Sequence, residues 1–315
     1  MKNTQEMNGF LDAICILCGS EVASTGKKPH DRMDADIVAC NECSHIQIYP
    51  PLSPEDEKKE YDKDAQFGRV MLTERLNFEL VRSKFNYWNK EHANMYFDLL
   101  QEFDNVLDLG AGYGFLMEEL NSRPNKMFNI EGIEIGKVRL DNFVGGVVHN
   151  INVLTDNIPK NLLNRYDCIL CLHLLEHISK PVEFLEKIKP LLKFNGKVIF
   201  EVPNINNFLR ELSPEYDDFT YMCQHCSYYS EKTLRLVFEK AGYHVEKIES
   251  REIYSVENHL HWLREGSPFI EYPQIYMPDE RLEWINRIYK EELSKQGKGD
   301  ALVIYAKPLI IELGS

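Results

Sequence analysis

One glycine-rich segment limits the possible folds of this chain more than any other feature. Residues 106–115 read VLDLGAGYGF, an apolar run followed by Gly110, Gly112 and Gly114 and then by the start of a helical pattern. A strand, a glycine turn and a helix in this order are typical of the loop that opens a nucleotide-binding α/β domain. The spacing G-x-G-x-G departs from the dinucleotide pattern, in which a third glycine would replace Phe115. Asp108, just before the loop, can receive a cationic amine or a bridging water.

The chain from residue 104 onward supports an α/β fold. Short β-rich runs alternate with helical patterns, and these runs read NVLDLG, FNIEGIEI, GVVHN, YDCILCL, GKVIFEVP, YHVEKIES and DALVIYAKP. The alternation predicts a doubly wound, mostly parallel sheet with helices on both faces, which binds ligands at the carboxyl ends of its strands. Glu134 ends the second run, where a carboxylate can accept both ribose hydroxyls. Asn152 and Val153 follow the third run and can meet an adenine edge and face.

The first four cysteines predict a metal site. Cys15 and Cys18 form one C-x2-C pair, and Cys40 and Cys43 form another after 21 intervening residues. A tetrahedral Zn²⁺ ion accepts four thiolates, and a site filled by four sulfur atoms has no position left for water. The predicted zinc is therefore structural and stabilises a segment too small to have its own core. Four unrelated buried cysteines are the alternative.

Changes in composition predict five regions. They are a zinc-binding knuckle (1–54), a helical connector or lid (55–103), the ligand-binding core (104–251), a helical insertion (252–299) and the last strand of the core (300–315). In the connector, Tyr61 and Phe67 are candidates to close over a ligand, with helix packing as the alternative. In the insertion, His259, His261 and Trp262 favour packing or a subunit contact over chemistry, which leaves a homodimer open.

The charge of the chain excludes several classes of partner. With 36 Lys and Arg residues against 50 Asp and Glu residues, the net charge is −14, which disfavours a nucleic-acid or anionic-membrane surface. Apolar runs are too short to span a bilayer, and the apolar patch near the N-terminus is too short for a signal peptide. A cytoplasmic protein with reduced cysteines is expected.

These motifs together resemble those of the class I S-adenosylmethionine-dependent methyltransferases. VLDLGAGYG resembles their nucleoside-binding motif, Glu134 their ribose-binding acid, YDCILCLHLLEHISKP their fourth-strand motif and DALVIYAKP their reversed seventh strand. The resemblance implies S-adenosyl-L-methionine as cofactor and a seven-stranded Rossmann-like core. More narrowly, the cysteine pairs followed by HIQIYPPLSPED resemble the bacterial subgroup that methylates nucleotide-linked sugars. The resemblance covers nearly the whole chain and is more specific for the cofactor than for the substrate.

Two histidines are candidates for the general base of methyl transfer. Glu176 and His177 follow the fourth strand and are expected to face the sulfonium methyl group, and the pKa of an ordinary histidine suits it to removing a proton from the acceptor. His225 precedes a helix that starts near Ser230, and a catalytic histidine sits in a comparable stretch of the sugar-methylating relatives. There a glutamate precedes it, whereas this chain has Gln224. We favour His225 as the base, with His177 orienting the acceptor hydroxyl, and the reversed roles remain open.

Other residues near the strand ends have weaker signals. A magnesium site on His173, Glu176 and His177 is disfavoured because Mg²⁺ prefers several oxygen ligands and only Glu176 offers one. Asn204 follows the fifth strand in VPNINN, where it can hydrogen-bond a substrate or build a turn with Pro203.

The remaining cysteine pairs do not predict a second metal site. Cys168 and Cys171 lie three positions apart on a strand, so their side chains point to opposite faces and cannot bind one ion. Cys223 and Cys226 flank His225 and are expected to be thiols that line the pocket.

The resemblance, together with the candidate bases, implies methyl transfer from S-adenosylmethionine to an oxygen of a sugar, and a nucleotide-linked sugar is favoured. Carbon methylation of a nucleotide-linked keto-sugar is the first alternative, because it also needs a base but must stabilise an enolate. A zinc-ribbon protein that binds or modifies RNA is the second, and the charge of −14 weighs against it.

Overall fold

The computed structural model describes residues 13–51, 78–267 and 280–309. In this part of the chain, seven strands form one mixed sheet in the order β10-β11-β8-β7-β4-β5-β6. The strands are β4 (Asn105–Leu109), β5 (Asn129–Ile133), β6 (Val148–His149), β7 (Tyr166–Leu172), β8 (Leu192–Pro203), β10 (Tyr243–Arg251) and β11 (Ala301–Pro308). Only β11 runs antiparallel to its neighbours, β8 and β10. The predicted doubly wound, seven-stranded core with a reversed last strand is confirmed.

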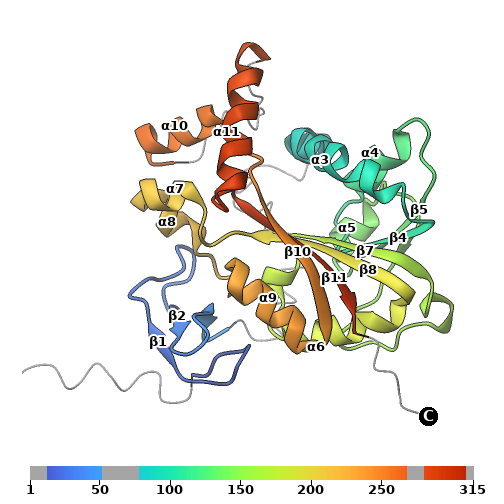
Figure 1. Cartoon of the computed structure of the whole chain (residues 1–315), viewed down its shortest axis with the longest axis horizontal. Helices are drawn as coiled ribbons and strands as arrows, with labels where there is room; N and C mark the ends of the chain where they lie inside the picture. The colour runs from blue at the N-terminus through green and yellow to red at the C-terminus, as the bar shows by residue number, and fades with distance from the viewer. Residues whose placement is uncertain (1–12, 52–77, 268–279, 310–315) are drawn as a thin grey trace, which may run out of the picture.

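Helices cover both faces of this sheet (Figure 1). The α-helices are α3 (Phe78–Leu100), α4 (Phe115–Ser122), α5 (Lys137–Asp141), α6 (Pro181–Ile188), α7 (Phe208–Leu212), α8 (Pro214–Thr220), α9 (Glu231–Lys240), α10 (Val256–Glu265) and α11 (Glu283–Lys295). Short 3-10 turns are η1 (Lys160–Leu162), η2 (Leu175–His177), η3 (Lys189–Leu191) and η4 (Glu280–Leu282). Helices α3 and α4 pack on one face, and α6 and α9 pack on the other.

The central strand β7 shows why the sequence forms this architecture. Its run YDCILCL is buried along nearly its whole length, as expected for a parallel strand covered on both faces. Cys168 packs in the cluster that includes Tyr96 of α3, whereas Cys171 packs in the cluster that includes Phe184 of α6. The two thiols therefore lie on opposite faces of the strand, as predicted.

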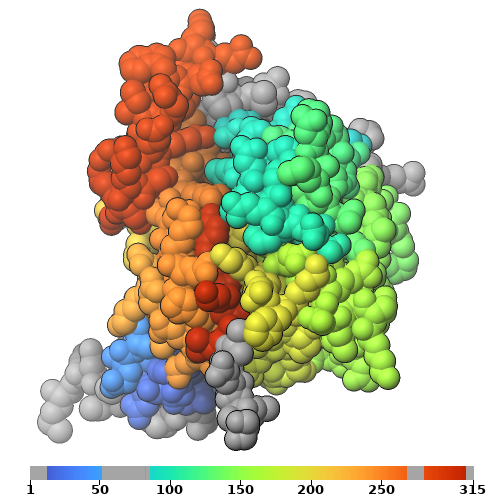
Figure 2. All heavy atoms as spheres, turned by 45° about the vertical axis from the view of Figure 1, so that its right-hand side comes forward, coloured from blue at the N-terminus to red at the C-terminus, as the bar shows by residue number. Residues whose placement is uncertain are grey.

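A second, four-stranded sheet lies at one end of the molecule. Its strands, in the order β1-β2-β3-β9, are β1 (Val22–Ser24), β2 (Asp36–Cys40), β3 (Ile46–Tyr49) and β9 (Ser227–Tyr228). The last strand comes from the core segment, because Ile46 pairs with Tyr228 and Gln47 pairs with Ser227. Figure 2 shows the N-terminal strands, in blue, at the end of the molecule away from the α10–α11 pair. The N-terminal region thus shares a sheet with the core.

Helices α10 and α11 lie between β10 and β11 in the sequence, within the predicted insertion. The indole of Trp262 packs against Tyr216 and Phe219 of α8, with ring centroids 4.9 and 5.1 Å apart. The Nδ1 atom of His259 lies 2.6 Å from the hydroxyl of Tyr289 on α11. Both contacts are intramolecular packing, and the homodimer remains a prediction. In the described residues, no helix is both long and apolar enough to cross a membrane.

Candidate functional site

The glycine loop joins β4 to α4 at the carboxyl end of the sheet. Gly110, Gly112 and Gly114 have φ values of +85°, +59° and +78°, a backbone region that side chains disfavour. A Cβ atom on Gly114 would lie 2.5 Å from the main-chain nitrogen of Gly145, so close packing requires glycine there. A Cβ atom on Gly112 would meet no described atom within 4 Å. Gly114 is therefore needed for packing, whereas Gly112 borders space that a ligand can occupy.

The carboxylate of Glu134 supports the loop from the next strand. Oε2 accepts a hydrogen bond from the N–H of Gly112 at 2.9 Å, and Oε1 accepts from the N–H groups of Ile135 and Gly136 at 2.9 and 2.7 Å. An ionised carboxylate has about four acceptor positions. Nη1 of Arg139 also lies 3.6 Å from Oε2, so there is room for roughly one more donor at most. Glu134 therefore fixes the loop, and its predicted binding of both ribose hydroxyls stays a prediction.

Asp108 is buried at the end of β4, beneath the loop. Burial and, to a lesser extent, the charge of Glu134 raise the pKa of its carboxyl group to about 7. A carboxylate in this environment gains stability when a cation approaches. Asp108 is thus suited to the predicted contact with a cationic amine.

Asn152 and Val153 form a turn after β6. The side-chain oxygen of Asn152 accepts from the N–H of Leu154 at 3.0 Å, and its own N–H donates to Asp156 at 2.9 Å. Val153 is buried in the core that includes β4 and β7. The turn lies one strand beyond Glu134 at the same end of the sheet, and the predicted adenine contact stays a prediction.

The glycine loop and the Glu176–His177 pair lie at neighbouring strand ends. Strands β4 and β7 are parallel and paired, and each runs into one of these segments. A Cβ atom on Gly110 would lie 3.0 Å from Cδ2 of Leu174, which precedes the pair. The glycine loop and the Glu176–His177 pair therefore lie at one edge of the sheet. Their roles in cofactor binding and acid–base chemistry stay predictions.

Three titratable side chains converge at this edge. Glu176 and His177 come from η2, and His225 comes from the segment before β9. Their ligating atoms all lie within 4.8 Å of one another, and the rings of His177 and His225 meet edge to face. Glu176 thus places a carboxylate near His225, although Gln224 precedes that histidine in the sequence.

The main chain fixes the tautomer of His177. Its Nδ1 atom lies 3.0 Å from the carbonyl oxygen of Gln224, and a carbonyl can only accept, so Nδ1 carries the proton. Burial lowers the pKa of His177, although Glu176 partly opposes the shift. The neutral ring therefore presents an unprotonated Nε2, the form that a general base requires. Gln224 acts here through its main chain, and its predicted side-chain contact with substrate is untested.

Glu176 is buried but not fully paired. Its Oε1 lies 3.4 Å from Nδ1 of His173 and 3.9 Å from Nε2 of His177. Its Oε2 has no hydrogen-bond partner among the described residues. Although burial raises the pKa of Glu176, the neighbouring histidines outweigh it and lower the pKa below its ordinary value. An ionised, buried oxygen without a donor is costly unless a ligand supplies one.

A second group of titratable side chains adjoins the first, and sequence reasoning missed two of its members. Oε1 of Glu201 on β8 lies 3.1 Å from Nε2 of His173 and 2.7 Å from Nε2 of His92 on α3. Burial lowers the pKa of His173, but the bonds to Glu176 and Glu201 outweigh it and raise the pKa to about 10. The sequence signal for Glu201 is a single acid inside the apolar run VIFEVP, whereas nothing local marks His92.

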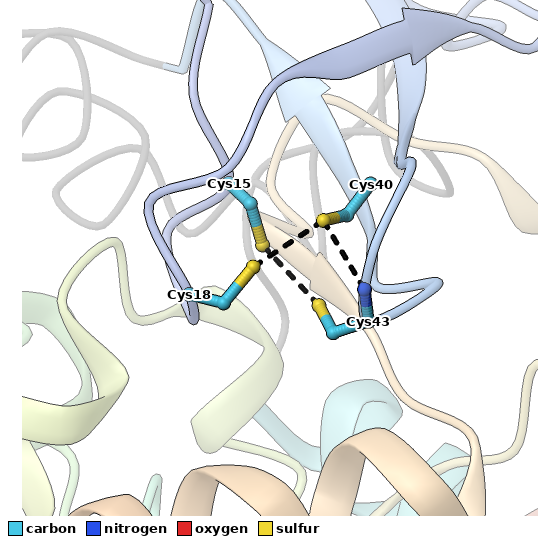
Figure 3. A group of neighbouring side chains, drawn as sticks. All are labelled: Cys15, Cys18, Cys40 and Cys43. Carbon is cyan, nitrogen blue, oxygen red and sulfur yellow. Dashed lines mark hydrogen bonds between the residues drawn. The ribbon is translucent and has the colours of Figure 1, made fainter.

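The four N-terminal cysteines form one cluster (Figure 3). The sulfur atoms of Cys15 and Cys43 are 3.5 Å apart, those of Cys18 and Cys40 are 3.3 Å apart, and none of the four forms a disulfide bond. Burial raises the pKa of the Cys18 thiol, but hydrogen bonds from Ser20 outweigh this effect and lower the pKa to about 6. Four convergent sulfur atoms fit a tetrahedral zinc ion, with its bonds of about 2.3 Å.

Of three further candidate residues, Asn204, Tyr61 and Phe67, the structure describes Asn204. The amide of Asn204 donates to the carbonyls of Gly297 and Gly299 at 3.1 and 2.8 Å, and its oxygen accepts from Asn206 at 3.0 Å. Its side chain therefore holds the segment just before β11, and we leave it out of the proposed substrate site. Tyr61 and Phe67 lie outside the described residues.

Comparison with known families agrees with this geometry. The family model described as a methyltransferase domain matches residues 74–248. The chain belongs to this methyltransferase domain family. The predicted resemblance to class I S-adenosylmethionine-dependent methyltransferases is confirmed at the level of the family. The match covers the glycine loop, both base candidates and the paired strands between them, but not the cysteine cluster.

Individual methyltransferases are similar over shorter stretches. A ubiquinone biosynthesis O-methyltransferase of Erwinia tasmaniensis is 29% identical over 128 residues, which cover 38% of this chain and 49% of that protein. One from Aeromonas salmonicida is 29% identical over 162 residues, covering 44% and 65%. A solved methyltransferase from Archaeoglobus fulgidus aligns at 18% identity and a TM-score of 0.47, covering 78% of this chain and 100% of that one. The chain spans about half the length of the first of these curated relatives.

Proposed function

We propose that this chain transfers a methyl group from S-adenosylmethionine to a hydroxyl oxygen of a small molecule, with His177 as the general base. The observation that carries the proposal is the tautomer of His177, whose Nδ1 is tied to the carbonyl of Gln224. Nε2 is then the basic nitrogen, next to Glu176, at the edge shared with the glycine loop. The sequence favoured His225, and this geometry favours His177 instead.

The residues of the loop suit the cofactor. The open side of Gly112 leaves room for a ligand against bare backbone, and Asp108 is a buried carboxylate suited to a cationic amine. Glu134 has about one acceptor position left for a ribose hydroxyl. When bound, the cofactor supplies the electrophilic methyl group, so the protein needs only to align the acceptor and remove its proton.

The acceptor that best satisfies this site has two neighbouring hydroxyl groups. One hydroxyl gives its proton to Nε2 of His177, and the adjacent one donates to the unpartnered Oε2 of Glu176. Both requirements are met by a vicinal diol. A nucleotide-linked sugar offers such a diol, and the resemblance of the cysteine pairs and HIQIYPPLSPED to sugar methyltransferases supports it.

A catechol-type ring is the second candidate acceptor. It also carries adjacent hydroxyls, and the curated relatives named above are ubiquinone biosynthesis O-methyltransferases. The similarity covers 38% of this chain and 49% of the Erwinia tasmaniensis enzyme. The methyltransferase-domain match over residues 74–248 does not include the cysteine cluster, whose resemblance to sugar methyltransferases favours the sugar over the ring.

The test is a transfer assay with labelled S-adenosylmethionine and a panel of nucleotide sugars, catechols and matched deoxy-sugars that lack one hydroxyl. We expect label on the oxygen of a vicinal diol and a large loss with the deoxy-sugars. Transfer to carbon, with solvent deuterium exchanged into a 4-keto-sugar in the absence of cofactor, would replace the oxygen proposal with the keto-sugar alternative. Failure of adenosyl-homocysteine to bind the folded chain would refute the whole proposal.

A further inference from the structure

Three side chains from separate elements converge beside the acceptor site. His92 lies in α3, His173 directly follows β7, and Glu201 lies near the end of β8. Both Nε2 atoms face the same carboxylate oxygen, and the three ligating atoms lie within 4.8 Å of one another. His92 and Glu201 are fully buried, whereas the side chain of His173 is 25% exposed. His92 and Glu201 are thus enclosed by protein, and His173 is the member of the three with a partly exposed side chain.

The contacts of His92 require a cation at its Nε2 atom. Nδ1 lies 2.8 Å from the carbonyl oxygen of Trp88, which can only accept, so Nδ1 carries a proton. A neutral ring would then direct the bare lone pair of Nε2 at Oε1 of Glu201, only 2.7 Å away. Two electron-rich atoms at this distance repel each other, so either a proton or a metal ion must lie between them.

His173 contacts the same carboxylate oxygen with its own Nε2 atom. Its Nδ1 faces Oε1 of Glu176 at 3.4 Å, while its Nε2 faces Oε1 of Glu201 at 3.1 Å. Its backbone has φ = +51°, which is unfavourable for a residue with a side chain, and its N–H donates to the carbonyl of Glu201 at 2.9 Å. The ring is thus held in this position by an uncommon backbone conformation.

We propose that His92, His173 and Glu201 bind a divalent transition-metal ion of the zinc type, at a site separate from the four cysteines. One ion satisfies both Nε2 atoms and the shared oxygen together, whereas without an ion each of the two Nε2 atoms needs its own proton. Imidazole nitrogen and carboxylate oxygen are ligands that such ions accept. The site goes beyond methyl transfer and does not depend on the proposed acceptor.

The surroundings match those of metal-bound histidines. Such histidines donate their other N–H to a carbonyl or a carboxylate, and here Trp88 and Glu176 provide these acceptors. The hydroxyl of Tyr96 donates to Oε2 of Glu201 at 2.6 Å, which leaves Oε1 for the ion. A tetrahedral ion with bonds of about 2.0 Å separates neighbouring ligand atoms by about 3.3 Å. The two nitrogen–oxygen contacts, at 2.7 and 3.1 Å, would therefore widen by roughly 0.2 to 0.6 Å when the ion binds.

The ion would also position the acceptor site. Three protein ligands leave a fourth coordination position, as in zinc sites that are not purely structural. Because Nδ1 of His173 faces Glu176, an ion that fixes the ring of His173 also fixes the carboxylate beside His177. His92, His173 and Glu201 are in this sense positioning residues for Glu176.

The test measures metal in the full chain, stripped with a chelator and reloaded with excess zinc or cobalt(II). We expect the wild type to hold one ion more per chain than His92→Gln. The cobalt–thiolate charge-transfer bands of the cysteine site should be the same in both proteins. His149→Gln is the matched control, because His149 also contacts a carboxylate, that of Glu131 at 2.8 Å, without a second histidine on it. It should keep the extra ion.

A second measurement needs no variant and so does not depend on whether His92→Gln folds. Zinc X-ray absorption of the reloaded wild type should show nitrogen or oxygen ligands in addition to sulfur. A purely sulfur-ligated spectrum, or equal metal content in the wild type and a folded His92→Gln variant, would overturn the proposal. In that case protons, and not a metal ion, neutralise the cluster.

Discussion

His177 and His225 meet edge to face, with ring centroids 4.8 Å apart and ring planes at 77°. His177 follows β7 of the large sheet, and His225 precedes β9, the strand that the core contributes to the small sheet. The candidate acceptor site therefore lies where the two sheets meet. One side of the site, at His225, therefore depends on the sheet that carries the cysteine cluster.

The first prediction concerns the base. His177→Ala should lower kcat by roughly 10²- to 10⁴-fold, the usual contribution of a general base. Its affinity for adenosyl-homocysteine should stay near that of the wild type, because His177 is not part of the glycine loop. The measurement is steady-state transfer combined with calorimetric binding of adenosyl-homocysteine.

His225→Ala is the informative comparison for this prediction. If His225 only packs against His177, His225→Ala should lower kcat less than His177→Ala does. A larger loss in His225→Ala would return the role of base to His225, as the sequence suggested. His244→Ala, an exposed histidine on β10, is the control and should behave as wild type.

The second prediction concerns the pH dependence of Asp108. Its folded-state pKa of about 7 exceeds the unfolded value of 3.8, so the folded protein binds this proton more tightly. Folding free energy is then lost as pH rises from about 4 to about 7, at roughly 1.4 kcal/mol per pKa unit. Asp108→Asn should therefore raise the free energy of unfolding at pH 8 by a few kcal/mol and leave it nearly unchanged at pH 4.

The same residue should lose function as it gains stability. Asp108→Asn should weaken adenosyl-homocysteine binding, because the amide cannot pair with a cationic amine. In the wild type, binding near pH 7 should release a proton, since the amine favours the ionised carboxylate. Calorimetry in buffers of different ionisation enthalpy measures this release, and its absence would show that Asp108 does not contact the amine.

The third prediction compares two glycines of the loop. Gly114→Ala should destabilise the protein by about 3 kcal/mol or more, because the new methyl group would overlap the backbone of Gly145 in an already unfavourable conformation. Gly112→Ala should cost only about 1–2 kcal/mol, from the left-handed backbone alone. It should nevertheless weaken cofactor binding, because its methyl group enters the space beside the loop.

Chemical denaturation and adenosyl-homocysteine binding separate the two glycine effects. Equal destabilisation in both variants would contradict the packing assigned to Gly114. Unchanged cofactor affinity in Gly112→Ala would mean that the ligand does not lie against this residue.

The fourth prediction concerns the cysteine cluster, which we propose binds a structural zinc ion. Cys40→Ser, or removal of the ion with a chelator, should lower the free energy of unfolding by several kcal/mol, because metal binding contributes directly to folding in small sites of this kind. Since β3 pairs with β9, kcat should also fall while the affinity for adenosyl-homocysteine is kept. Cys223→Ser is the matched control and should retain the ion. Loss of cofactor affinity in Cys40→Ser would contradict this local effect.

The sequence by itself determined the elements of the core and the order of its motifs. Strand β7 could be predicted from its nearly continuous apolar run, because a parallel strand buried on both faces needs apolar residues at nearly every position. Gly110, Gly112 and Gly114 identified the loop, since only glycine adopts its backbone conformation without strain. The two C-x2-C pairs predicted the cluster because close sequence spacing places paired thiols on one turn.

Only the tertiary structure decided which distant residues meet. The pairing of β9 with β3 could not be predicted, since a two-residue strand has no periodic signal of its own. The contact of His92 with Glu201 could not be predicted either, because the two residues lie on α3 and β8. Only packing of the helix onto the sheet brings them together. The tautomer of His177 depends on a main-chain carbonyl, and a carbonyl group is the same for every residue type. Local propensities and residue spacings can be predicted from the sequence, whereas contacts between distant elements depend on how their buried faces pack.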